Sequence, residues 1–314
     1  MTITQLKYVL AVAEYRNFTI ASEHCFVTQP TLSMQIQKLE DELDILIFNR
    51  NKKPIELTEI GEKIIQQAKI VIDESKRINH IVNEQKGHVG GDFRLGIIPT
   101  IMPTLLPLFL KTFVRKYPKI TLKIEELTTE QIVKKLNDGN IDAAIAATPL
   151  KNDSIKELPI YNEPFVGFVP DDHPLFKKKT LHVNDLEGQD ILVLEDGHCF
   201  KDNIVNLCQT MNFEKRKFQL HSGSFETLIQ LSKEGLGMTL LPYLNTQHIN
   251  EDAKKNIIEF SEPAPAREVS IIYHKSQLKK NLIGELKKTI DGIIRGVIAF
   301  DNVKIVSPLK KELV

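Results

Sequence analysis

Two of the three cysteines of this chain, Cys199 and Cys208, lie close together in the sequence. Cys199 follows a strand-like run at residues 190–194 and an acidic-glycine turn, at the point where the pattern predicts the start of a helix. A thiol at a helix N-terminus experiences the positive end of the helix dipole, which favours the thiolate. A second thiol nearby can condense with the first one once that has been oxidised. Two purely structural cysteines are the alternative interpretation.

The composition restricts the class of protein. The chain has 314 residues, 42% of them hydrophobic, and a formal net charge of zero, which predicts a globular protein of two or three compact units. The N-terminal residues lack the features of a signal peptide, and no apolar run approaches ~18 residues. An odd number of cysteines argues against a secreted disulfide framework. We therefore expect a cytoplasmic protein without a membrane span, in which any disulfide is transient and regulatory.

The first fifty residues have the pattern of a helix-turn-helix. Apolar residues at helical spacing predict helices over residues 3–15 and 29–43, with a short helix ending near Cys25 between them. Thr28 is placed to cap the third helix, and Pro30 lies in its first turn. The third helix buries one apolar face, and the opposite face and its flanks carry the residues expected to contact DNA, namely Gln29, Pro30, Thr31, Ser33, Met34, Gln37 and Lys38.

Three side chains of this N-terminal head have chemistry suited to DNA. The Gln37 amide can form two hydrogen bonds with adenine, and Lys38 can contact phosphate or guanine. Arg50 follows a strand-like run and is expected on a wing that touches the DNA backbone. A plain helical bundle with a solvated face is the alternative, because residues 1–87 carry 11 Lys and Arg against 12 Asp and Glu.

Five segments of the head form specific motifs. Residues 18–22, 27–33, 36–40, 48–50 and 57–61 read FTIAS, VTQPTLS, IQKLE, FNR and LTEIG. Together they resemble the winged helix-turn-helix of LysR-type transcriptional regulators, and the resemblance continues along essentially the whole chain. It implies an all-α DNA-binding domain over residues 1–58 and double-stranded DNA as a partner. Met34 and Gln37 stand where relatives often have a smaller or a more basic residue, so the preferred DNA sequence does not follow from it.

Residues 58–85 are predicted to form one long helix. Two columns of residues alternate along it like a coiled-coil seam, one mostly small (Gly61, Ala68, Ser75 and Val82) and one branched (Ile64, Val71 and Ile78). Packing against the chain's own body is the alternative, but a helix of this length usually needs a partner helix. The resemblance implies a homodimer through a linker helix, residues 59–86, which a flexible hinge follows at residues 87–91.

Predicted strands and helices alternate after the hinge, which indicates parallel βαβ units. The resemblance implies an α/β regulatory domain over residues 92–314, with two subdomains like those of periplasmic solute-binding proteins. Subdomain I is placed at about 92–163 and 268–300, and subdomain II at about 164–267. Strands near 164–166 and 267–269 are expected to cross between them, a long helix is expected over about 278–298, and the residues after Phe300 are expected to form a tail.

The cysteine region has a closer resemblance of its own. Residues 194–199, LEDGHC, together with Cys208 match the redox motif of the peroxide-sensing OxyR branch of the LysR family. The resemblance implies that the Cys199 thiolate attacks hydrogen peroxide and becomes a sulfenic acid, which Cys208 resolves to a disulfide. It also implies supporting residues around the thiol, namely His198, Thr100, Thr129, Asp202 and Arg267.

The supporting residues have different expected roles. Thr100 and Thr129 each lie at a predicted helix start, where they orient the peroxide beside free amide groups or act as plain helix caps. Arg267 is expected to favour the thiolate and to stabilise the departing hydroxide, and a surface arginine is its alternative. His198 is expected to form a hydrogen bond near the thiol, and Asp202 to anchor the following turn.

A disulfide between these cysteines requires a change of structure. If they bracket a helix, they lie roughly 13 Å apart, at about 1.5 Å per residue. A disulfide needs Cα atoms closer than ~7 Å, so the segment between them must refold on oxidation. The resemblance further implies a redox-sensing transcriptional activator of oxidative-stress genes that assembles as a homotetramer, with RNA polymerase as a further candidate partner.

Two other functions remain open from the sequence. A LysR regulator gated by a small metabolite has the same architecture, with both cysteines structural. A thiol peroxidase has the same thiol chemistry, but catalysis needs neither a DNA-binding head nor a long dimerisation helix, so we expect no enzyme. The nine His and three Cys show no paired metal-ligand spacing, and we expect neither a metal nor a cofactor.

Overall fold

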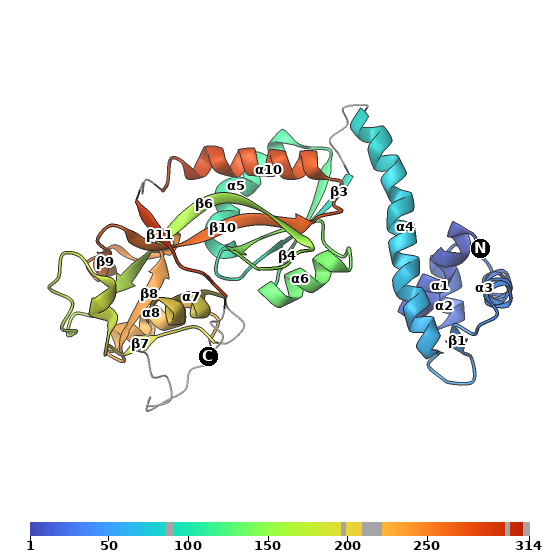
Figure 1. The fold of residues 1–314 in the computed structure, drawn as a ribbon, viewed down its shortest axis with the longest axis horizontal. Helices are drawn as coiled ribbons and strands as arrows, with labels where there is room; N and C mark the ends of the chain where they lie inside the picture. The colour runs from blue at the N-terminus through green and yellow to red at the C-terminus, as the bar shows by residue number, and fades with distance from the viewer. Residues whose placement is uncertain (86–90, 196–198, 209–221, 299–301, 310–314) are drawn as a thin grey trace. The chain divides into compact units, whose positions relative to one another are not determined.

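The computed structural model describes residues 1–85, 91–195, 199–208, 222–298 and 302–309. The chain forms two compact units, residues 1–88 and 89–314 (Figure 1). Within the described part of the chain, no helix combines the length and the apolar character needed to cross a bilayer. The predicted fold class, an all-α head followed by an α/β domain, is confirmed.

The first unit is the predicted helix-turn-helix. Its helices are α1 (Ile3–Tyr15), α2 (Phe18–His24) and α3 (Gln29–Leu43), followed by the hairpin β1 (Phe48–Asn49) and β2 (Glu56–Leu57). Thr28 caps α3, since its hydroxyl accepts a hydrogen bond from the Thr31 N–H. Leu32, Ile36 and Leu39 are fully buried, so the face of α3 predicted to be apolar forms the core of the head.

The long helix α4 (Glu59–Gln85) completes this unit, and Ile64 and Val71 of the branched column are partly buried against the core of the head. Ala68 of the small column is buried in the core of the head, together with Ile65 and Ile72. A Cβ atom on Gly61 would lie 2.2 Å from the Ile47 carbonyl oxygen, so only glycine fits where α4 meets the head. The interpretation of both columns as one dimer seam was therefore wrong at Gly61 and Ala68, because these positions pack against the chain's own head.

The second unit begins with a parallel α/β layer. The strands β3 (Gly91–Ile97), β4 (Ile120–Glu126) and β5 (Ala143–Thr148) pair in parallel in the order β4-β3-β5. Helices α5 (Met102–Lys116) and α10 (Lys280–Ile294) pack along one face, and α6 (Thr129–Asn137) lies on the other (Figure 1). These elements enclose a hydrophobic core, called core I here, that includes Phe93, Phe109 and Leu286.

Two long strands connect this layer to a second one. The antiparallel strands β6 (Ile155–Phe168) and β10 (Ala264–His274) pair with each other and continue the sheet as β5-β10-β6-β8-β7. The second layer contains β7 (Ile191–Leu192), β8 (Met238–Pro242), β9 (Ile257–Glu259) and the helices α7 (Cys199–Leu207), α8 (Phe225–Lys233) and α9 (Glu251–Lys254). Its hydrophobic core, core II, includes Phe165, Phe200 and Leu228.

The predicted crossing strands correspond to β6 and β10, and three expectations for the second unit need correction. The strand expected at 190–194 is limited to Ile191–Leu192. Helix α10 is shorter than expected and covers Lys280–Ile294. The expected tail is also wrong, because β11 (Val303–Ile305) pairs in parallel with the start of β10. A strand expected at 218–221 lies outside the described residues.

Candidate redox site

Helix α7 carries both cysteines of the predicted pair, one at each end. Cys199 is its first residue, and the Cys208 N–H donates to the Ile204 carbonyl directly after its last turn, at 2.9 Å. Both thiols are free and buried. Cys199 belongs to core I and Cys208 to core II, so the helix holds the two sulfur atoms in different layers. The predicted separation by one helix is confirmed, and the described structure is the dithiol state.

The first turn of α7 is anchored by an aromatic cluster. The Phe200 ring packs edge-on against Phe165 and Phe225, with centroids 5.2 and 5.0 Å away. The Arg267 guanidinium carbon lies 5.5 Å from the centroid of the same ring. Phe200 therefore connects the helix that begins with Cys199 to the strand β10 that carries Arg267.

Arg267 is fully buried, which excludes the interpretation of a surface arginine. Its Nη1 donates to the Thr100 hydroxyl at 2.9 Å, and its Nη2 donates to the Thr100 carbonyl at 3.1 Å. Its Nε and Nη2 both donate to one carboxylate oxygen of Glu163, at 2.9 and 2.7 Å. Three of the predicted site residues therefore converge here, because Arg267 binds Thr100 directly and its charge acts on the Cys199 thiol.

Thr129 lies in the wall of the same site. The residue that caps α6 is Thr128, whose hydroxyl accepts from the Gln131 N–H, so Thr129 is not the plain cap considered from the sequence. The Thr129 hydroxyl is buried and has no hydrogen-bond partner of regular geometry among the described residues. It lies close enough to the Cys199 thiol to lower the pKa of that thiol. A buried hydroxyl beside a thiol provides a polar group for a small oxygen-containing ligand.

The amide groups that follow Thr100 form backbone hydrogen bonds, whereas the sequence led us to expect free amide groups. Helix α5 starts after Ile101, and the N–H groups of Ile101 and Met102 both donate to the Ile98 carbonyl. These amides close a tight turn and do not form a free anion site. Thr100 itself is buried, and what it offers to the site is a hydroxyl held in place by Arg267.

Burial determines the resting protonation state of both thiols. Desolvation raises the pKa of Cys199, and Arg267 and Thr129 oppose this by lowering it. Asp202, one turn along α7, raises the pKa of Cys199 further. Burial alone raises the pKa of Cys208 to about 12. Both cysteines are therefore thiols at neutral pH, and Arg267 is the main charge that favours the Cys199 thiolate.

Three side chains that hold the site together, those of Glu163, Asn203 and Asn206, were not predicted from the sequence. Glu163 lies directly opposite Arg267 in the β6–β10 register, and its second carboxylate oxygen accepts from the Leu244 N–H at 3.0 Å. Asn203 and Asn206 of α7 donate to the backbone of the C-terminal segment. The position of Glu163 directly before the apolar run at 164–169 could have indicated a buried carboxylate. His198 lies outside the described residues, and among those described no group of His, Cys, Asp and Glu is arranged to hold a metal ion.

The predicted DNA-contacting face of α3 is accessible. Gln29, Pro30 and Thr31 at its start are exposed, as are Met34, Gln37 and Lys38, whereas Ser33 is half-buried. The Met34 side chain is 60% exposed among these polar residues. The face identified from the sequence is therefore open to a partner.

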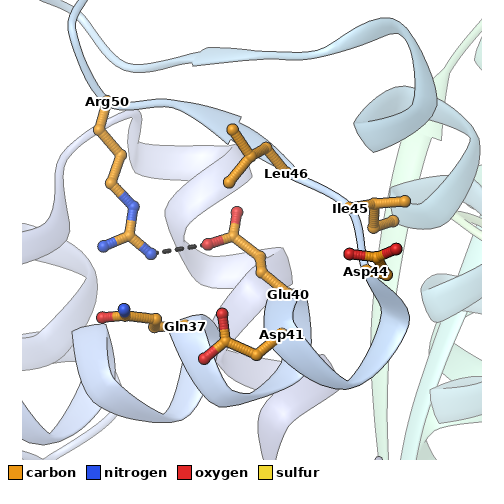
Figure 2. Close-up of a pocket in the computed structure, with 7 residues that line it drawn as sticks. All are labelled: Gln37, Glu40, Asp41, Asp44, Ile45, Leu46 and Arg50. Atoms are coloured by element: carbon orange, nitrogen blue, oxygen red, sulfur yellow. Dashed lines mark hydrogen bonds and ion pairs between the residues drawn. The ribbon is translucent and has the colours of Figure 1, made fainter.

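Arg50 has an internal role that the sequence did not indicate. Its Nη2 pairs with Glu40 at 2.7 Å, and its guanidinium lies over the Phe18 ring at 5.4 Å. Glu40 is buried and also accepts from the N–H groups of Ile47 and Phe48. Figure 2 shows this ion pair at one side of a pocket of about 460 Å³, whose other lining residues include the acidic Asp41 and Asp44. Arg50 thus fastens the wing to α3.

Comparison with known families covers nearly the whole chain. The family described as bacterial regulatory helix-turn-helix protein, lysR family, matches residues 3–62, and the LysR substrate binding domain matches residues 86–290. The chain is 33% identical over 297 residues to the hydrogen peroxide-inducible genes activator of Pectobacterium carotovorum, covering 94% of this chain and 98% of that protein. It is 31% identical over 303 residues to the DNA-binding transcriptional dual regulator OxyR of Escherichia coli, covering 96% and 98%.

Solved structures give the same assignment. The full-length C199D variant of OxyR from Pseudomonas aeruginosa superposes with a TM-score of 0.75 at 33% identity, covering 92% of this chain and 94% of that one. A cysteine variant of OxyR from Corynebacterium glutamicum with hydrogen peroxide bound superposes with a TM-score of 0.63 at 28% identity, covering 94% and 93%. The chain therefore belongs to the LysR family of bacterial transcriptional regulators, in its OxyR branch.

Proposed function

We propose that this protein is a peroxide-sensing transcriptional regulator whose Cys199 and Cys208 form a reversible disulfide that changes its binding to DNA. The observation that supports this most strongly is the position of the Cys199 thiol. It starts α7 beside the Thr129 hydroxyl and within reach of the charge of Arg267, and Cys208 ends the same helix. The names of the similar proteins, hydrogen peroxide-inducible genes activator and OxyR, describe the same activity.

The chemistry proceeds in two balanced steps. The Cys199 thiolate attacks one oxygen of hydrogen peroxide, the O–O bond breaks, and the departing hydroxide takes up a proton to become water. The resulting sulfenic acid is attacked by the sulfur of Cys208, which forms the disulfide and releases a second water. Two thiols are oxidised and one peroxide is reduced.

Arg267 and the two threonines have distinct parts in the first step. Arg267 stabilises the thiolate and the negative charge that develops on the departing oxygen, because its guanidinium is fixed in a buried position. The Thr129 hydroxyl and the Thr100 hydroxyl supply hydrogen bonds to the peroxide. His198 and Asp202 are assigned the supporting roles that the family resemblance implies, a hydrogen bond near the thiol and an anchor for the following turn.

The second step requires α7 to unfold. Its nine residues place the two ends about 13 Å apart, whereas a disulfide requires Cα atoms within ~7 Å. Loss of α7 removes Phe200 from its aromatic cluster and Cys208 from core II. A covalent bond that exchanges one packed arrangement for another gives the two states that a sensor needs.

The assembly follows from the same proposal. The protein acts in the cytoplasm as a homodimer through α4, and dimers pair into a homotetramer on double-stranded operator DNA. Gln29, Pro30, Thr31, Ser33, Met34, Gln37, Lys38 and Arg50 form the DNA-contacting set. As an activator of oxidative-stress genes it contacts RNA polymerase.

A thiol count tests the redox function directly. The protein is treated with one equivalent of hydrogen peroxide, its free thiols are counted, and its peptides are mapped, with a Cys25→Ser variant as control. We expect two thiols to disappear and a Cys199–Cys208 peptide to form. Recovery of both thiols unmodified would overturn the proposal and favour a regulator gated by a small metabolite.

A second experiment separates the sensor from the scaffold. A Cys199→Ser variant should fold and bind DNA with a footprint that no longer responds to peroxide, because a hydroxyl does not form the nucleophilic anion at neutral pH. A Cys208→Ser variant should still react at Cys199 and stop at the sulfenic acid or go on to higher oxidation states. A Cys199→Ser protein whose footprint still shifts with peroxide would remove Cys199 from the role of sensor.

A further inference from the structure

We propose that Glu163 is a positioning residue of the redox site: it fixes the direction of the Arg267 guanidinium and balances part of its charge. The inference rests on the proposed function, in which Arg267 acts on Cys199 and on the peroxide. No expectation from the sequence included Glu163, which lies on β6 and is fully buried.

Three contacts fix the two side chains relative to each other. Glu163 and Arg267 are direct neighbours across the β6–β10 pair, so the strand register brings them together. One Glu163 oxygen accepts from both Nε and Nη2 of Arg267, and the other accepts from the Leu244 N–H. The Leu244 bond holds the carboxylate at its far side, so it cannot rotate away from the arginine. This leaves Nη1 of Arg267 directed at the Thr100 hydroxyl.

The charge of Glu163 has an effect separate from its geometry. Both members of the pair have no exposed surface, so their charges are weakly screened by solvent. Arg267 lowers the pKa of Cys199, and an adjacent carboxylate reduces the positive potential that reaches the sulfur. Glu163 thus keeps Arg267 in place and at the same time limits how strongly it stabilises the thiolate.

Several other groups on the surrounding helices and strands face Cys199 and affect the pKa of its thiol. Arg267 of β10 and the Ala147 N–H of β5 lower the pKa of the thiol, as does Thr129 of α6, whereas Asp202 of α7 raises it. Tyr161 of β6 lies near Glu163 and Arg267, and burial raises its pKa so far that it stays neutral. His198 precedes Cys199 and lies outside the described residues.

Two substitutions separate the effect of the length of the Glu163 side chain from the effect of its charge. Glu163→Asp keeps the charge and shortens the side chain by one methylene, so Arg267 loses its fixed direction. Glu163→Gln keeps the length and removes the charge, so the full positive potential of Arg267 acts on the thiol. Glu268→Gln is the matched control, because Glu268 is the next residue on β10 and bonds to Thr148 instead of Arg267.

The first readout is the ionisation of Cys199 and needs no peroxide. In a Cys25→Ser, Cys208→Ser background, thiolate absorbance near 240 nm is followed against pH. We expect Glu163→Gln to lower the pKa of Cys199 by about 1, a tenfold change in the thiolate-to-thiol ratio. The Glu268→Gln control should titrate like its parent. A parent-like titration of Glu163→Gln would remove the charge-balancing role.

The second readout is the rate of Cys199 oxidation by hydrogen peroxide. We expect Glu163→Asp to slow it on the order of tenfold to a hundredfold, since a group displaced by about 1 Å loses its effect on the reaction. In an Arg267→Gln background the same change should alter the rate by less than about twofold, because Glu163 acts through Arg267.

The outcomes separate this inference from the proposed function. Glu163→Asp retains a counter-charge for Arg267, so it tests the inference even if Glu163→Gln fails to fold. If Glu163→Asp oxidises at the parental rate, or slows Arg267→Gln as much as it slows the parent, Glu163 is a structural ion pair only. If the parent itself fails to form the Cys199–Cys208 disulfide, the proposed function falls, and the titration still decides whether Glu163 controls Cys199.

Discussion

The Cys199 thiol is poised between two opposing effects at the scale of single residues. Desolvation raises its pKa, while the Arg267 charge and the Thr129 hydroxyl lower it. A fully exposed thiolate would react with many oxidants and electrophiles, whereas a buried thiol beside a fixed cation reacts when a small peroxide enters. Selectivity for hydrogen peroxide therefore depends on a few polar groups around Cys199, and a single substitution can remove each of them.

Thr129 offers the sharpest single-residue prediction. Thr129→Val keeps the shape of the side chain and removes a hydroxyl without a regular hydrogen-bond partner among the described residues. The free energy of unfolding should therefore stay within about 1 kcal/mol of the parent value. The oxidation rate at neutral pH should fall on the order of tenfold, because the pKa of Cys199 rises when the hydroxyl is lost. Denaturant unfolding and stopped-flow oxidation measure the two quantities, and an unchanged rate would contradict the role of Thr129.

Helix α7 and the C-terminal segment form one unit at the scale of elements. Asn203 donates to the Val306 carbonyl at 2.7 Å, and Asn206 donates to the carbonyls of Ser307 and Leu309 at 2.8 and 2.7 Å. Strand β11 fastens the same segment to β10 just before Arg267. Because the disulfide requires α7 to unfold, these bonds stabilise the reduced state and must break on oxidation.

Deleting residues 302–314 should shift the redox equilibrium toward the disulfide. Loss of the three asparagine bonds destabilises the reduced state by about 2 kcal/mol, at roughly 0.5–1.5 kcal/mol per bond. For a two-electron couple this lowers the reduction potential by about 40 mV. Equilibration with a dithiol buffer of known potential measures it. The control is deletion of 310–314, beyond the last of these contacts, and equal potentials for the two deletions would refute the stabilising role.

The DNA-binding head gives a second prediction at this scale, because Lys38 and Arg50 differ in their surroundings. Lys38 is exposed, so Lys38→Ala should leave thermal stability unchanged, weaken binding to all DNA sequences and reduce the salt slope by about 1. Arg50→Ala should also lower the melting temperature, because it leaves the buried Glu40 without its ion-pair partner. Melting curves and binding titrations at several salt concentrations separate the two. Equal melting temperatures for both variants would show that the ion pair does not stabilise the wing.

Assembly belongs to the scale of the whole molecule and depends on α4. Residues of both columns of this helix pack on the head, whereas Ile78 of the branched column is 64% exposed and Ile70, which lies outside both columns, is 54% exposed. Exposed isoleucines along one long helix are typical of a surface that a second copy covers. The proposed dimer therefore uses the side of α4 that carries Ile70 and Ile78.

Ile78→Asp should dissociate the dimer without unfolding the monomer, since the side chain is mostly exposed within one chain. Sedimentation velocity measures the oligomeric state, and circular dichroism verifies the fold. Lys69→Asp is the control, because Lys69 is exposed on the same helix and lies roughly 180° around its axis from Ile78. A dimer that persists in Ile78→Asp would place the interface elsewhere.

Local sequence patterns determined much of this protein. Apolar spacing and the Thr28 cap define α3 and its exposed face, and the strand, turn and thiol order places Cys199 at the start of α7. These features follow from the sequence because they depend on residues within a few turns of each other. The same holds for the conclusion that one helix separates the two cysteines.

Other features were decided only by tertiary structure. Glu163 and Arg267 are 104 residues apart, and only the register of β6 against β10 makes them partners. Thr128 caps α6, so the Thr129 hydroxyl is available to the Cys199 thiol. Two adjacent threonines in a sequence do not show which of them caps the helix. The C-terminal strand likewise exists because β10 offers it an edge. Pairing between these strands is stabilised by contacts between segments that lie far apart in the sequence. No single stretch of sequence is therefore sufficient to predict it.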